Sequence, residues 1–237
     1  MPVTAIFLDS AGVLFDKDAL GREWIRTISE ALASQLGGDV GAWKRASVTA
    51  SVNAMKRHEA RMRKDGGGGG AKAFLARDRV SWLLEACDAM HISPPADAEI
   101  LAEEITRGAG SRVDAALPGA ADRIRELRDA GFTLFTASSQ ASLELTAQLR
   151  SLGIRELFDR TYGPDLVDRW KTGPHYYEAI LKDAIVKPES AAVVDDGSER
   201  LDWARKRGVR TFLMVAAPQS GPHTVIRSLS ELPALLR

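Results

Sequence analysis

The second half of the chain alternates between short apolar runs and longer helical patterns, and this alternation constrains the fold more than any other feature. The apolar runs are rich in β-branched and aromatic residues, as buried strands are. These runs cover residues 132–136, 190–196 and 209–215, with a weaker run at 158–163. The last helical pattern covers residues 228–237. Repeated strand–helix units are typical of a parallel sheet with helices on both faces. We therefore predict an α/β fold with a Rossmann-like parallel sheet core.

One more buried strand is expected at the start of the chain, over residues 3–9, and about 100 mostly helical residues separate it from the others. Helical spacing of apolar residues covers 18–36, 41–64 and 71–91, and a further helix follows residue 93. The five glycines at 66–70 predict a flexible loop, because ordering them costs too much entropy. We predict a sheet core of residues 1–15 and 114–237, with an inserted helical cap of residues 16–113.

Composition excludes several classes of function. The 237 residues include 32 basic and 32 acidic side chains, so the formal net charge is zero and nothing favours nucleic acid or an anionic membrane as a partner. The single cysteine, Cys87, lies in a helical pattern and is expected to be a buried core thiol. No secretory leader pattern or membrane-spanning run is evident, so we expect a cytoplasmic protein. A homodimer stays an open possibility.

Polar side chains are expected at the carboxyl ends of the predicted strands, where parallel sheets bind their ligands. The first strand ends at Asp9, the strand 132–136 ends at Thr136, and the strand 190–196 ends at Asp195 and Asp196. Lys171 precedes a Gly-Pro turn that opens a helix. Three carboxylates in one place repel one another unless a cation lies among them, and oxygen ligands suit Mg²⁺. A hydroxyl, backbone N–H groups and an ammonium group could hold a phosphoryl group beside the ion.

In this order and spacing, the four elements resemble the motifs of the haloacid dehalogenase (HAD) superfamily. They are Asp9 followed by Gly12, Thr136 after an apolar strand, Lys171 before Gly-Pro, and the acidic pair. The resemblance covers the core, and the insertion lies where that superfamily places a helical cap of the C1 type. It implies that Asp9 is the nucleophile and that Thr136 and Lys171 stabilise the phosphoryl group.

The resemblance also suggests the remaining roles. It implies that Asp195 and Asp196 bind Mg²⁺ together with Asp9, while Ala11 contributes its backbone carbonyl. We assign substrate binding to the strand ends and to the second cap helix, at Gly12, Ala137, Ser138, Lys56 and His58.

Position 11 departs from the pattern of phosphatases in this superfamily, which have a second Asp there as general acid–base. Such a group typically contributes about 10²–10⁴-fold in rate, and Ala11 cannot supply it. The substrate could therefore have a good leaving group or carry its own proton donor, or His58, Glu59 or Lys56 of the cap could act as the acid.

Ala11 is also consistent with a different reaction or with a site that has lost its activity. Phosphonoacetaldehyde hydrolases resemble this site, with Asp-x-Ala-Gly and a cap lysine that forms a Schiff base, for which Lys44 and Lys56 are candidates. Haloacid dehalogenases also lack the second Asp and attack carbon without Mg²⁺, although the acidic pair favours a metal. Alternatively, the site could have decayed into a binding protein.

We predict a Mg²⁺-dependent hydrolase of a small phosphorylated or phosphonate metabolite, acting through Asp9. The alternatives are a 2-haloacid dehalogenase-like hydrolase and a catalytically impaired binding protein on the same fold.

Overall fold

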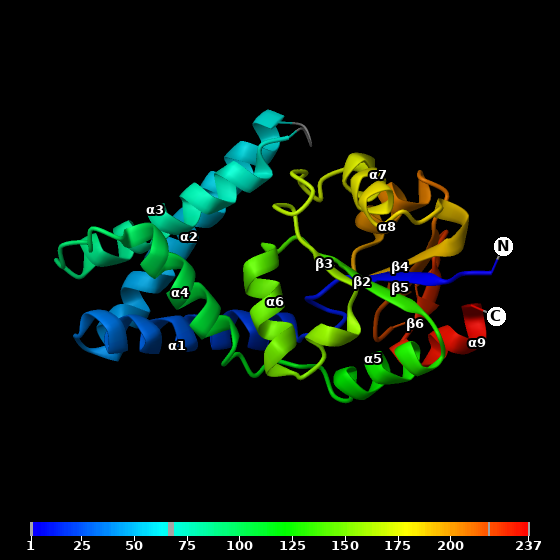
Figure 1. The fold of residues 1–237 in the computed structure, drawn as a ribbon, viewed down its shortest axis with the longest axis horizontal. Coiled ribbons are helices and arrows are strands. Elements are labelled where there is room, and N and C mark those ends of the chain that lie inside the picture. Colours follow the sequence, from blue (N-terminus) through cyan, green and yellow to red (C-terminus); the bar gives the residue numbers. More distant parts are fainter. Residues whose placement is uncertain (1, 66–68, 218, 237) are drawn as a thin grey trace.

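The computed structural model describes residues 2–65, 69–217 and 219–236. Within these ranges, six strands form one parallel sheet in the order β3-β2-β1-β4-β5-β6. The strands are β1 (Ala5–Leu8), β2 (Thr133–Ala137), β3 (Arg160–Tyr162), β4 (Ala191–Asp195), β5 (Arg210–Met214) and β6 (Thr224–Ile226). The prediction of an α/β fold with a parallel sheet is confirmed. The first strand lies at the centre of the sheet although it is remote in sequence from its neighbours (Figure 1).

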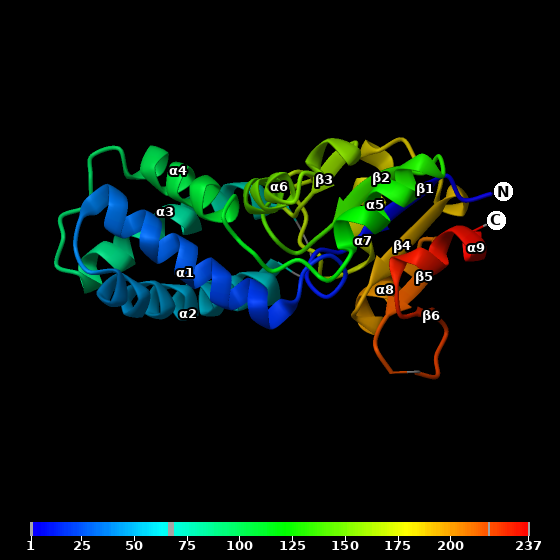
Figure 2. The same ribbon diagram turned by 90° about the horizontal axis from the view of Figure 1, so that it is seen from below.

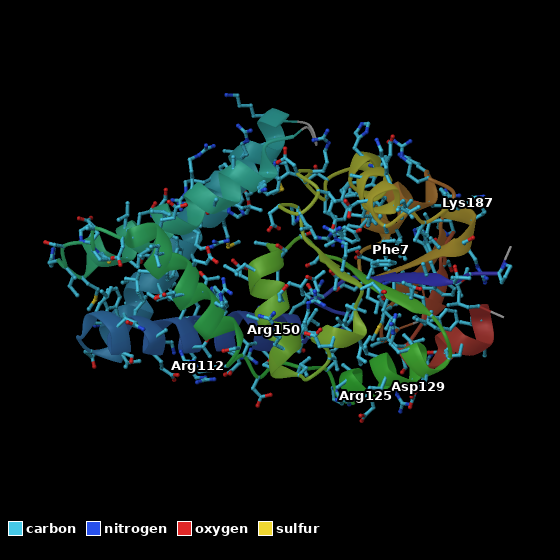
Figure 3. All side chains as sticks on the ribbon, viewed as in Figure 1. Phe7, Arg112, Arg125, Asp129, Arg150 and Lys187 are labelled. Atoms are coloured by element: carbon cyan, nitrogen blue, oxygen red, sulfur yellow. The ribbon has the colours of Figure 1, made fainter. Side chains whose placement is uncertain are left out.

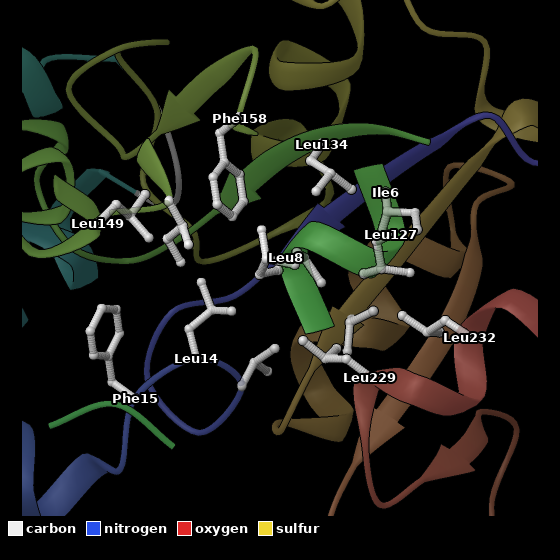
Figure 4. Packing of buried hydrophobic residues seen from close by; sticks show 14 of the residues in the cluster. Ile6, Leu8, Leu14, Phe15, Leu127, Leu134, Leu149, Phe158, Leu229 and Leu232 are labelled. Atoms are coloured by element: carbon white, nitrogen blue, oxygen red, sulfur yellow. The ribbon is translucent and has the colours of Figure 1, made fainter. Parts of the chain in front are cut away.

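Helices cover both faces of the sheet because successive strand residues point to opposite sides. In β1, Ile6 and Leu8 belong to one hydrophobic cluster, whereas Ala5 and Phe7 belong to another. The first cluster includes residues of α5 (Ala120–Asp129), α6 (Ser142–Ser151) and α9 (Leu232–Leu236), and Figure 4 shows part of it. The second includes residues of α7 (Pro174–Asp183) and α8 (Ser198–Arg205). Figure 1 shows the sheet between α7 and α8 on one side and α5 and α9 on the other, and Figure 2 shows it from the side of α5 and α9.

Apolar side chains fill the interior of the structure, and charged side chains lie on its surface. Phe7 is fully buried in the sheet, where its ring stacks on Phe135 at 4.8 Å between centroids. The labelled charged side chains, among them Arg112, Arg150 and Lys187, lie on the outside of the ribbon (Figure 3).

The helical segment between β1 and α5 has a hydrophobic core of its own. It consists of α1 (Lys17–Leu36), α2 (Val40–Asp65), α3 (Ala71–Ala89) and α4 (Ala98–Gly110). Trp43, Leu83 and Cys87 are fully buried among its apolar residues, so Cys87 is the core thiol that we expected. Helix α4 of this segment packs against α6 of the sheet part. The two helices approach so closely that position 110 requires glycine, because a Cβ on Gly110 would lie 2.8 Å from the Cβ of Ala147.

The structure differs from our expectations in the last part of the chain. The strand β6 was not predicted, because its three residues are too few to show the hydrophobic alternation that identifies a strand. The predicted helix 228–237 is shorter, with a 3₁₀ turn at Leu229–Glu231 before α9. Within the predicted glycine loop, residues 66–68 lie outside the described residues, while the backbone N–H of Gly70 donates to Asp168 at 3.0 Å. In the part of the chain described, no helix has the length and apolarity to cross a membrane.

Candidate active site

A small pocket lies at the carboxyl edge of the sheet, beyond the ends of β1, β2 and β4. Its volume is about 100 Å³. The lining side chains come from the loops after these strands and from the starts of α1 and α8: Asp9, Ser10, Ala11, Lys17, Ser138, Ser139, Gln140, Asp196 and Arg200. The parallel topology thus brings residues about 190 positions apart in sequence to one edge, as the sequence pattern indicated.

Lys171 joins two of the strand-end carboxylates. Its Nζ donates to Asp9 Oδ1 at 3.0 Å and to Asp195 Oδ2 at 2.6 Å, and it also contacts the carbonyl of Ala137. Asp195 Oδ1 accepts from the N–H of Gly197 at 2.8 Å, so both of its oxygens have partners. The Lys171 side chain is only 1% exposed. This lysine is therefore a buried cation whose three donors are all engaged.

Burial and the neighbouring charges shift the pKa values of Asp9 and Lys171 in opposing directions. Burial raises the pKa of Asp9; Lys171 lowers it and Asp195 raises it further. Burial by itself would lower the pKa of Lys171, but the carboxylates of Asp9 and Asp195 outweigh it and raise that pKa. Lys171 is therefore charged at neutral pH, and a second cation would help to keep Asp9 ionised.

Asp196 completes an acidic cluster. One carboxylate oxygen from each of Asp9, Asp195 and Asp196 lies within 4.8 Å of the others. Asp196 Oδ2 forms an ion pair with Lys17, whereas Oδ1 is buried and has no hydrogen-bond partner in the described chain. A buried carboxylate oxygen without a partner is costly. The donor set, all oxygen and negatively charged, fits a hard divalent cation such as Mg²⁺.

Two predicted residues act through their backbone or through the absence of a side chain. Gly12 has φ +86°, and a Cβ there would lie 2.1 Å from Asp196 Oδ2, so only glycine leaves room for this carboxylate. Ala137 is fully buried and offers its carbonyl to Lys171. Ala11 lines the pocket with no ionisable group.

The hydroxyl residues that line the pocket beyond β2 are Ser138 and Ser139, whereas Thr136, which we predicted, does not line it. Thr136 lies within the strand, is fully buried and donates to the carbonyl of Tyr162 on β3 at 3.1 Å. Ser138 follows the last residue of β2, and its Oγ lies 2.7 Å from Ser10 Oγ. Ser10 Oγ donates in turn to Gln140 Oε1 at 3.0 Å. The strand runs further than the sequence indicated, so the first free hydroxyl comes two residues later.

The predicted cap residues do not line this pocket. His58 lies on a separate, larger cavity, and its Nε2 is 2.8 Å from Asp78 Oδ2. Lys56 and Lys44 are exposed and line neither cavity. Three rings still join the helical segment to the sheet part: the ring of Trp170, next to Lys171, lies 5.6 Å from that of Phe74 and 5.9 Å from that of His58.

Sequence reasoning missed five of the pocket residues: Ser10, Lys17, Ser139, Gln140 and Arg200. Ser10 and Gln140 lie in the loops directly after β1 and β2, a position that could have identified them. Lys17 begins α1, and only the fold shows that this helix start returns to the edge of the sheet.

The comparison with protein families accounts for this arrangement. Residues 3–219 match the model of the haloacid dehalogenase-like hydrolase family. The chain belongs to this family. Among curated relatives, it is 32% identical over 99 residues to Protein CbbY of Cereibacter sphaeroides, a match that covers 40% of this chain and 43% of the relative. The match thus spans less than half the length of that relative.

Solved structures of this family share the fold. The defluorinating L-2-haloacid dehalogenase Rha0230 matches with a TM-score of 0.65 and 17% identity, over 99% of this chain and 95% of the other. The putative HAD-hydrolase YfnB from Bacillus subtilis, which was solved bound to magnesium and reveals interdomain movement, matches with a TM-score of 0.61 and 17% identity, over 100% and 99%. At these identities the likeness concerns the fold alone.

Proposed function

We propose that this hydrolase acts on small phosphorylated metabolites, with Mg²⁺ as cofactor and Asp9 as covalent nucleophile. One observation carries the proposal: Asp196 Oδ1 is buried with no partner among the described residues, beside the carboxylates of Asp9 and Asp195. Such a cluster needs a cation, and a cation beside a nucleophilic carboxylate suits the transfer of a charged phosphoryl group.

The residues that would hold the ion are Asp9, Asp196 and the backbone carbonyl of Ala11. Asp195 already accepts from Lys171 and Gly197, so its role is to position the lysine. When bound, Mg²⁺ neutralises negative charge between the carboxylates and the phosphoryl oxygens.

The remaining chemistry belongs to side chains of the pocket. Lys171 holds Asp9 Oδ1, so the other carboxylate oxygen is left to attack phosphorus. As the new oxygen–phosphorus bond forms, the bond from phosphorus to the leaving oxygen breaks, and that oxygen takes a proton from solvent. Water then attacks the phosphorus of the aspartyl phosphate, which releases phosphate and restores Asp9. The positive charge of Lys171 and the hydroxyl of Ser138 stabilise charge on the phosphoryl oxygens.

Ala11 restricts the substrates that this pocket turns over quickly. Without a general acid, the leaving oxygen must depart with little help, which favours acyl phosphates, phosphoanhydrides and aryl phosphates over alkyl esters. A phosphonatase reaction through a cap lysine has little support, because Lys44 and Lys56 are exposed and line neither cavity.

The test is phosphate release from a panel of acyl, anhydride, aryl and alkyl phosphates, with and without Mg²⁺. We expect release that Asp9→Asn abolishes and that a chelator removes. If no compound is hydrolysed with any divalent metal, the proposal is wrong and a binding protein on this fold is favoured.

A 2-haloacid dehalogenase is the second candidate. It is favoured by the missing acid at Ala11 and by the fold shared with L-2-haloacid dehalogenases. Halide release from 2-chloropropionate that persists in a chelator would support this function instead.

The division of the chain belongs to the same proposal. We assign residues 16–113 to a cap that covers the site and residues 1–15 and 114–237 to the catalytic core, since the helical segment has a large hydrophobic cluster of its own, while a smaller cluster around Leu75 and Trp170 joins the two parts.

A further inference from the structure

We propose that the larger cavity, between the cap and α6, binds the non-reacting part of the substrate, and that this part is an apolar body carrying a positive and a negative group, as in an aromatic amino acid. This inference rests on the function proposed above. The cavity has a volume of about 290 Å³ and is lined by residues of α1, α2, α3, α4 and α6.

Two ionisable side chains of opposite type face this cavity, and among the described residues they form no ion pair with each other. Arg79 of α3 and Glu144 of α6 both line it. Within the described residues, neither side chain has a hydrogen bond or an ion pair, and Arg79 Nε is buried without a partner. The positive charge of Arg79 lowers the pKa of Glu144, although burial raises that pKa overall. A ligand that carries a cation for Glu144 and an anion for Arg79 would satisfy both.

The other charged residues of the cavity are already paired. Asp78 accepts from His58 at 2.8 Å and from Arg57, and Arg57 also contacts Glu85. This network leaves Arg79 and Glu144 as the pair available to a ligand. Because Glu144 can take a cation and Arg79 an anion, the two together favour a zwitterion over a compound with a single charge.

Apolar side chains form the rest of the wall. Trp24, Trp82, Ile28 and Leu75 line the cavity, and an aromatic ring of the ligand would pack against the indoles. A purely polar zwitterion would leave this surface in contact with water, so the apolar body is part of the assignment.

The cavity is next to the catalytic pocket along one segment of chain. Ser138, Ser139 and Gln140 line the catalytic pocket, while Ala141 and Glu144, which follow immediately, line the larger cavity. A substrate with its phosphoryl group at Asp9 could therefore extend along the start of α6 towards Glu144.

Four aryl phosphates test the proposal because they share a phenolic leaving group: phenyl phosphate, O-phosphotyramine, 3-(4-phosphonooxyphenyl)propionate and O-phospho-L-tyrosine. At pH 8, above the pKa of about 7 to which burial raises Glu144, we expect kcat/KM for phosphotyrosine to exceed that of either singly charged compound by about tenfold or more, as hydrogen bonds between charged groups allow. Glu144→Gln should remove its advantage over the propionate, and Arg79→Met its advantage over phosphotyramine. The matched controls are Glu189→Gln and Arg77→Met, two exposed residues that line neither cavity.

The outcomes distinguish a failure of the cavity assignment from a failure of the proposed phosphatase function. Equal kcat/KM values across the series, with Mg²⁺-dependent turnover intact, would overturn the inference and leave the phosphatase standing. If no phosphate is released, calorimetric titration of the wild-type protein with L-tyrosine, tyramine and 3-(4-hydroxyphenyl)propionate decides the matter alone. Binding of tyrosine about tenfold tighter than either analogue supports the cavity assignment, and equal or absent binding refutes it.

Discussion

Replacing Glu144 by glutamine should stabilise the protein at alkaline pH and leave it almost unchanged at acidic pH. Burial raises the pKa of Glu144 from 4.5 to about 7, even though Arg79 and His58 oppose the rise; Asp165 and Asp78 add to it. The folded protein therefore keeps this proton up to about pH 7, whereas the unfolded chain releases it near pH 4.5. The unfolded state binds fewer protons in between, so the free energy of unfolding falls as pH rises through this interval and is level above it.

The size of the effect follows from the two pKa values. At 1.36 kcal/mol per pH unit, the interval from 4.5 to about 7 corresponds to about 3 kcal/mol. Because Glu144 is not fully enclosed, solvent reduces the cost, and we expect about 2 kcal/mol. Glutamine keeps the shape of the side chain but cannot ionise, so this loss should be missing from Glu144→Gln.

Urea-induced unfolding at pH 5 and pH 8 measures the difference. The wild type should lose about 2 kcal/mol more between these pH values than Glu144→Gln does, at equal m-values. The exposed Glu189→Gln serves as the matched control, and repeating the pair in a His58→Gln background isolates the carboxyl from the neighbouring imidazole. If wild type and Glu144→Gln show the same pH dependence, the carboxyl is already ionised in the folded protein and the reasoning fails.

Three further substitutions test the catalytic pocket. Lys171→Met should lower the free energy of unfolding by about 3–5 kcal/mol, because it leaves Asp9 and its neighbour as buried unpaired charges; a loss below about 1 kcal/mol in urea titration would show that these charges are solvated. Asp196→Asn should weaken Mg²⁺ binding at least about tenfold by calorimetry, since it removes a charged ligand; unchanged affinity would place the ion elsewhere. Ala11→Asp should raise turnover of alkyl phosphate esters by up to about 10²–10⁴-fold, and a lower rate in a steady-state assay would mean that the pocket serves other chemistry.

The gathering of Asp9, Asp195 and Asp196 could be predicted from the sequence because it depends only on topology. Each acid ends an apolar run, and parallel strands all end at the same edge of the sheet. An error of one or two residues in a strand boundary does not move such a group to another edge.

Residues whose role depends on an exact boundary could not be predicted in this way. Thr136 and Ser138 are both hydroxyl residues near the end of one strand, and only the observed end of β2 at Ala137 decides between them. Lys17 reaches the pocket because of the angle at which α1 leaves the core, and no local pattern encodes that angle. The larger cavity likewise combines α3 and α6, whose packing depends on the whole helical segment between β1 and α5.

The contact of Trp170 with Phe74 and His58 gives the molecule a built-in optical reporter. The indole is 3% exposed and lies one residue from Lys171, yet two of its ring neighbours belong to α2 and α3. Any swing of these helices away from the sheet would transfer the indole from an apolar surrounding to water and shift its emission to longer wavelength. The difference in fluorescence between wild type and Trp170→Phe would then follow that swing in real time, without substrate or added dye.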